Sequence, residues 1–151
     1  MVEKTVHKTW LLDGLFHSAP GFITLEENTF SFSLVDTGTF SKKRLYKFEP
    51  YQGLTEIFDK LRSEEVVEII KIDFDKISAH FPWYNFMGGA VLTFENFKQK
   101  MQLSFMQPQN TKFPYHRVDN TVVQLMAIDE GVKDLKAGRI FGRKLQKTLT
   151  K

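Results

Sequence analysis

Residues Ile69–Met106 read IIKIDFDKISAHFPWYNFMGGAVLTFENFKQKMQLSFM, and this stretch decides the fold. Apolar and charged residues alternate over 70–75, which is typical of a strand with one apolar face. A second apolar run follows at 91–94, and a third alternation follows at 101–105. We expect three antiparallel strands here, whose apolar face the rest of the chain must cover.

The residues before this stretch also predict strands. A strand-like segment spans 7–16, and Ala19-Pro20-Gly21 predicts a turn after it. Apolar residues at 23–25 and alternating residues at 30–34 flank the tight turn Glu27-Asn28, which indicates a hairpin. Arms this short require packing against the central stretch.

One helix is expected between the two groups of strands. Residues 36–44 have the composition of a loop, and 45–48 predict a short strand. An apolar stripe with helical spacing then consists of Leu54, Ile57, Phe58 and Leu61. We therefore expect an inserted helix near 54–62.

A further helix is expected near the C-terminus, capped by Asp119 or Asn120. Its apolar face consists of Val122, Leu125, Met126, Ile128, Val132 and Leu135. Three glycines at 131, 138 and 142 together cost about 3 kcal/mol relative to alanine, so the helix weakens there unless something stabilises it. We divide the chain into a domain at 1–137 and a basic tail at 138–151.

The composition indicates one globular domain with a thick apolar core. The chain has 151 residues, and 15 of its aromatic side chains are phenylalanine, which carries no polar group. It has no cysteine, which excludes disulfides, thiol nucleophiles and cysteine-based metal sites. No signal-like or transmembrane segment is visible, so we expect a cytoplasmic protein, with peripheral attachment to a membrane left open.

Several runs resemble bacterial pleckstrin-homology-like and GRAM-like domains. The runs at 74–78, 88–94 and 103–105 are similar to the middle strands of such domains. Those at 13–14, 20–25 and 28–30 are similar to their opening. The resemblance implies a mainly β fold, with a partly open barrel of two antiparallel sheets capped by a C-terminal helix. It also implies binding of phosphoinositides, other lipids, peptides or partner domains, rather than catalysis.

The resemblance departs from phosphoinositide-binding members at one loop. Those members place basic residues beside the first strand-to-strand connection, which we assign to Phe16–Gly21. This segment contains neither lysine nor arginine. Candidate contacts with an anion, a membrane or a partner are therefore sought among the basic residues elsewhere in the chain.

Two basic clusters are the candidate contacts. One comprises Lys42, Lys43, Arg44 and Lys47 on a loop and strand edge, where a solvated loop or protection of a sheet edge is an equally good interpretation. The other comprises Arg139, Arg143, Lys144 and Lys147 in the tail.

Phe141, Leu145 and Leu149 follow one another at helical spacing between the basic residues of the tail. This is the composition of an amphipathic basic helix that binds an anionic membrane or an acidic partner. The alternatives are a frayed terminus or a helix packed on its own domain.

Residues 81–87 are rich in aromatic side chains, and Trp83, Tyr84 and Phe86 form a candidate apolar tip. Such a tip can insert into a membrane interface or a groove on a partner. We favour the other interpretation, in which these side chains fold back over the end of the barrel.

No catalytic, metal or cofactor site is predicted. His7, His17, His80 and His116 are widely separated, and no phosphate-binding glycine loop is present. Basic residues interleaved with stacking aromatics are absent, which argues against nucleic acid. We expect a non-catalytic binding module that engages a protein partner or an anionic membrane. The alternative is a β-barrel carrier of a hydrophobic small ligand, lined by Phe30, Phe32, Phe94 and Phe105.

Overall fold

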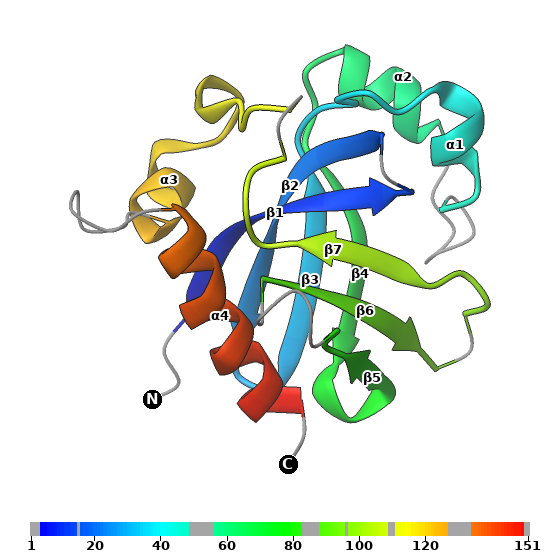
Figure 1. The fold of residues 1–151 in the computed structure, drawn as a ribbon. Coiled ribbons are helices and arrows are strands. Elements are labelled where there is room, and N and C mark those ends of the chain that lie inside the picture. The colour runs from blue at the N-terminus through cyan, green and yellow to red at the C-terminus, as the bar shows by residue number, and fades with distance from the viewer. Residues whose placement is uncertain are drawn as a thin grey trace.

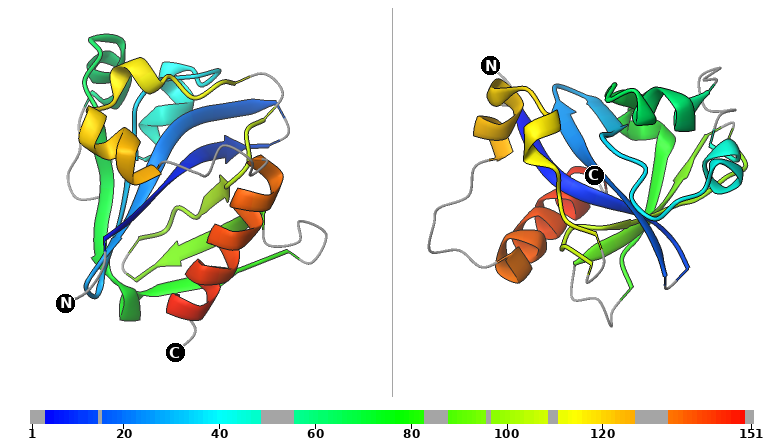
Figure 2. Two further views of the ribbon diagram at one scale, coloured as in Figure 1. Left: turned by 90° about the vertical axis from the view of Figure 1, so that its left-hand side faces the viewer. Right: turned by 90° about the horizontal axis from the view of Figure 1, so that it is seen from above.

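The protein is a seven-stranded antiparallel sheet that curls into a half-barrel, with a C-terminal helix, α4, across its open side (Figures 1 and 2). The computed structural model describes residues 4–14, 16–48, 56–82, 88–95, 97–108, 111–126 and 134–149. This confirms the mainly β fold class, its C-terminal helix and the inserted helix near 54–62.

The strands occur in the spatial order β4-β3-β2-β1-β7-β6-β5. Their bounds are β1 Thr5–Asp13, β2 His17–Glu26, β3 Thr29–Leu34, β4 Val67–Asp73, β5 Ile77–His80, β6 Gly89–Phe94 and β7 Met101–Ser104. The helices are α1 Lys42–Tyr46, α2 Ile57–Arg62, α3 Asn120–Met126 and α4 Asp134–Leu149, with 3-10 turns η2 Phe74–Lys76 and η4 Tyr115–Arg117. Strand β1 pairs with both β2 and β7, so the sheet is continuous.

The predicted turn at Ala19-Pro20-Gly21 is wrong, because β2 runs straight through these residues. The chain turns earlier, at Gly14, whose φ of 74° suits glycine. The Pro20 carbonyl accepts a hydrogen bond from the Val35 N–H. The nitrogen of Pro20, which carries no hydrogen, faces this same side of the strand. Pro20 lies just beyond Gly21, the last β2 residue paired with β3. The predicted turn at Glu27-Asn28 is confirmed.

The central stretch contains four strands rather than the three expected. Residues Phe74–Lys76 form η2 instead of continuing the first strand, and β5 follows immediately. The Phe74 N–H donates to the Asn28 carbonyl, which fixes η2 beneath the β2–β3 turn. Strands β4 and β5 therefore lie at opposite edges of the sheet although only three residues separate them in sequence.

Residues 42–46 form helix α1, so the strand predicted at 45–48 is wrong. The Ser41 hydroxyl accepts a hydrogen bond from the Arg44 N–H and caps the helix. Leu45 is fully buried, and helical spacing brings Phe48 to the same side, where it also enters the core. Helix α2 begins at Ile57 and buries Ile57 and Leu61, while Leu54 of the predicted stripe lies outside the described residues.

The concave side of the sheet holds the main core. Phe30, Phe32, Phe94 and Phe105 are each at most 2% exposed and belong to one continuous apolar cluster, which the inward side chains of α1, α2 and α4 complete. A smaller cluster lies on the outer side of β1, where Trp10 packs edge-on against Phe113 beneath α3. Both faces of β1 are thus covered.

The structure describes two helices in the C-terminal region, and the second is helical through two of the glycines that were expected to weaken it. Helix α3 ends at Met126, and α4 continues through Gly138 and Gly142 to Leu149, so the boundary drawn at 137/138 falls inside α4. A Cβ at Gly138 would lie 2.8 Å from the Phe105 carbonyl oxygen and 2.7 Å from Met106 Cγ. Glycine at this position therefore lets α4 approach the sheet closely, and this packing stabilises the helix.

We predict that Gly138→Ala destabilises the protein by about 1–3 kcal/mol, because the added methyl group overpacks the contact with Phe105. Helix propensity alone predicts the opposite, a gain of about 1 kcal/mol. The free energy of unfolding in urea distinguishes the two. Lys136→Ala, at an exposed position of the same helix, is the control and should change stability by less than about 0.5 kcal/mol. A more stable Gly138→Ala protein would contradict the close approach.

Candidate functional site

The basic cluster at 42–47 lies on α1, and counter-charges hold most of it. Arg44 Nη1 and Lys47 Nζ lie 2.8 and 2.9 Å from the same Asp13 oxygen, and Lys42 Nζ lies 3.2 Å from Asp59 Oδ2. Lys43 alone in this cluster has no ion pair with an acid among the described residues. These contacts tie α1 to the end of β1 and to α2.

Asp13 is the acceptor at the centre of this arrangement. Burial by itself raises the pKa of its carboxyl group, but hydrogen bonds from Lys47 and Arg44, with the attraction of their charges, hold that pKa below its usual value. Asp13 therefore stays ionised and keeps two of the four basic groups paired. A structural role for most of the cluster follows.

The basic residues of the predicted tail lie on the outward side of α4. Arg143, Lys144 and Lys147 of this tail are exposed, as is Lys136 just before it, and Arg139 is half-buried. At 100° per residue these five positions fall within one arc of the helix surface. The sequence contains no acidic residue between Leu135 and Leu149. We call Lys136, Arg139, Arg143, Lys144 and Lys147 the cationic strip.

The charges of the strip agree with the direction of the helix. Asp134 is the first residue of α4, and Arg143, Lys144 and Lys147 lie in its second half, close to the negative end of the helix dipole. Lys144 Nζ donates to the Thr5 hydroxyl at 2.6 Å, a neutral partner that leaves the charge uncompensated. Arg143, Lys144 and Lys147 form no ion pair within the part of the chain that the structure describes.

The inward side of α4 packs on the sheet. Phe141 and Leu145 are 4% and 0% exposed, and Leu149 packs partly against the same core. The Phe141 ring stacks on His7 of β1 at a centroid distance of 4.4 Å and meets Phe105 edge-on. Of the three interpretations of the tail, the structure therefore agrees with the third, a helix that packs on its own domain.

The two basic clusters are not brought together. Helix α1 lies beside the β1–β2 turn with α2, whereas α4 crosses the far side of the half-barrel (Figures 1 and 2). The predicted apolar tip of Trp83, Tyr84 and Phe86 falls outside the described residues. The candidate contacts thus form two separate surfaces, of which only the one on α4 carries several uncompensated charges.

The four histidines also lie apart. His7 is buried, with Nε2 3.2 Å from the Phe105 carbonyl oxygen, and His17 Nδ1 lies 3.1 Å from the Thr39 carbonyl oxygen. His80 and His116 are exposed on different elements. Among the described residues, no three His, Asp or Glu side chains are arranged to hold a metal ion.

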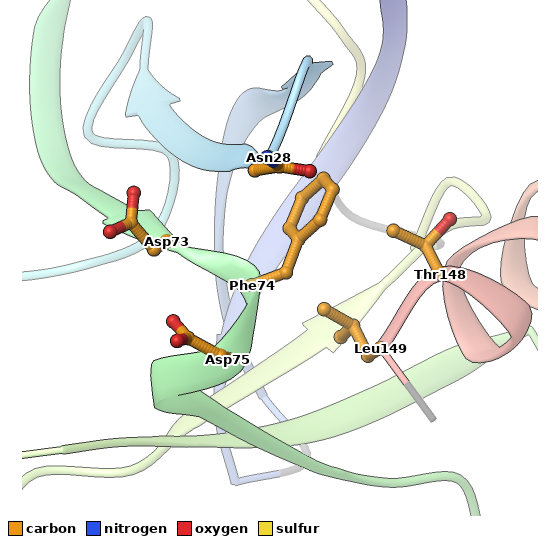
Figure 3. A pocket seen from close by; sticks show the side chains of 6 residues that line it. All are labelled: Asn28, Asp73, Phe74, Asp75, Thr148 and Leu149. Carbon is orange, nitrogen blue, oxygen red and sulfur yellow. The ribbon is translucent and has the colours of Figure 1, made fainter. Parts of the chain in front are cut away.

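The surface formed by the described residues includes two hollows. One, of about 420 Å³, is next to the end of α4, and in Figure 3 the Phe74 ring stands between Asp73 and Asp75 on one side and Thr148 and Leu149 on the other. The second, of about 440 Å³, lies on the outer face of β2, β3 and β4 and is lined by hydroxyl, carboxylate and ammonium groups. The carboxylates on both rims make these hollows poor sites for an anion.

Sequence reasoning missed four exposed side chains. Lys136 and Ile140 lie on the outward side of α4, and Ile140 is 52% exposed among the cations. Their helical spacing relative to Arg143 and Lys147 could have placed them on the same helix face. Phe16 and Tyr46, which are 75% and 66% exposed, carry no such pattern. Within the described residues, no helix is long and apolar enough to cross a membrane.

We predict that Asp13→Asn lowers the free energy of unfolding by about 1 kcal/mol near pH 7, a small value because Arg44 and Lys47 are both more than a third exposed. The folded-state pKa of Asp13 is lowered, so its contribution is present above the unfolded-state pKa and disappears as the pH falls through the folded-state pKa. The free energies of unfolding of the two proteins in urea should therefore converge once the pH falls below the folded-state pKa of Asp13. Asp59→Asn, which removes a well-exposed pair, serves as the control; a difference that persists in acid would contradict this role of Asp13.

No protein-family model, curated protein or solved structure matches this chain. The likeness to pleckstrin-homology-like and GRAM-like domains accordingly rests on the sequence runs quoted above. Of the two basic surfaces, the one on α4 is the one in which several cations, Arg143, Lys144 and Lys147, form no ion pair among the described residues.

Proposed function

We propose that the protein is a non-catalytic binding module, of the pleckstrin-homology-like or GRAM-like kind, that engages an anionic membrane surface or an acidic protein partner. The observation that carries the proposal is the cationic strip. It places five basic residues on one helix face, four of them exposed, with no acid between Leu135 and Leu149. We propose a cytoplasmic location, with attachment at the periphery of the membrane.

A concentration of like charge on one face costs folding energy through mutual repulsion, so it calls for a functional reason. Several basic residues elsewhere in the fold are paired with acids: Arg44 and Lys47 share Asp13, and Arg117 Nη1 lies 2.8 Å from Asp36 Oδ1. Arg143, Lys144 and Lys147 have no such acid partner among the described residues. An anionic surface would supply the missing counter-charges.

The packing of the core supports a binding module over a carrier of a hydrophobic ligand. The four phenylalanines that would line a carrier's cavity instead contact other core side chains, and the rings of Phe30 and Phe94 lie 6.1 Å apart. The scattered histidines support the absence of catalysis, since a nucleophile, base and orienting group have to converge. The outer surface then carries the function.

We predict that the triple variant Arg143→Glu/Lys144→Glu/Lys147→Glu binds anionic surfaces roughly 100-fold more weakly, since each basic residue near such a surface contributes about 1 kcal/mol. Binding is measured on a sulfated polyanion matrix, as the salt concentration needed for elution, and on anionic vesicles by sedimentation. Retention by the natural sequence should fall steeply with added salt.

The matched control is Lys98→Glu/Lys100→Glu/Lys112→Glu, which makes the same change in net charge at exposed positions outside α4. It should retain most of the binding, because the proposal depends on where the charges lie and not on their number. Equal losses in the two triple variants, or no loss in the α4 variant, would overturn the proposed function.

A further inference from the structure

We propose that the cationic strip binds the plane of an anionic lipid bilayer while α4 remains docked on the sheet. The proposal rests on the function proposed above and names its partner and its mode of attachment. In this mode α4 lies parallel to the membrane, its basic side chains reach the headgroups, and its apolar side chains stay in the protein core.

The dimensions of the strip suit a plane. Lys136 and Lys147 are three helical turns apart on the same side of α4, which at 1.5 Å per residue places their backbones about 16 Å from each other. Arg143 and Lys144 lie between them. A straight helix bearing charges along one side touches a flat surface along its whole length, and mobile lipids gather beneath the charges without a matching shape.

The remaining side chain of this face also suits a bilayer. Ile140 is exposed at the centre of the strip, and it is the apolar residue that the outward arc offers. A protein interface draws its affinity from a cluster of aromatic and aliphatic anchors, and a nucleic-acid surface uses stacking aromatics. One isoleucine among cations provides neither, but lysine and arginine stems with an aliphatic residue between them match the headgroup boundary of a membrane.

The packing of the inward face of α4 supports the docked state. Phe141 and Leu145 are buried, Phe141 is stacked on His7, and the backbone at Gly138 is against Phe105. An inserted amphipathic helix would need this same stripe, and withdrawing it would open the main core to water. The outward strip needs no such rearrangement, because four of its five basic side chains are already exposed.

The absence of cysteine from the chain allows a direct test of the docked state. In Thr5→Cys/Lys144→Cys, thiols replace two side chains that contact each other between β1 and α4. A short bifunctional thiol reagent then fixes α4 to the sheet, and mass spectrometry confirms the link. Linked and unlinked samples carry the same charges, so they are compared on phosphatidylcholine vesicles with and without phosphatidylserine.

We expect both samples to bind phosphatidylserine vesicles with affinities within about twofold of each other, and neither to bind pure phosphatidylcholine. Ile140→Asp should weaken binding about tenfold or more, because it places a carboxylate at the membrane boundary, whereas Ile140→Lys should not. Loss of vesicle binding on cross-linking would overturn the docked mode in favour of insertion. Strip-dependent retention on the polyanion without vesicle binding would overturn the lipid partner while leaving the proposed function intact.

Discussion

The open side of the curled sheet is the constraint on which the rest of the structure depends. Seven strands that enclose only part of a barrel leave the phenylalanine-rich interior facing water on one side. Phe141 and Leu145 of α4 cover it, and Gly138 lets the helix come close enough to do so. The helix is therefore part of the core and not an appendage to it.

Because α4 covers the core, it has a buried inward face and an exposed outward face. The inward face is fixed by packing against β1 and the residues around Phe105, so the helix has a defined rotation about its axis. That rotation determines which residues point outward, and the outward set is basic. A cationic surface thus arises from the same contacts that close the fold, and the packed inward face gives this surface rigid support.

Local patterns predicted the elements whose neighbours are close in sequence, such as the β2–β3 hairpin and α2. Local patterns gave wrong predictions where contacts with residues distant in sequence determine the local structure. The strand through Pro20 depends on where β3 ends, and α1 forms at Leu45 because the core accepts that side chain. The basic residues at 42–47 looked available, yet Asp13, which neutralises two of them, is about thirty residues away in the chain. The tail was recognised as amphipathic, but periodicity does not say which surface covers its apolar stripe.

The pairing of β1 with both β2 and β7 has a consequence for how the chain reaches this structure. Strands β1 to β4 and strands β5 to β7 each pair in consecutive order, so each set can assemble from contacts nearby in sequence. Joining the two sets brings Trp10 beside Ser104 and so closes a very long loop. Closing this loop costs chain entropy, which makes the joining step slow. Helix α4 contacts both sets, so we expect it to dock after the two sets have joined.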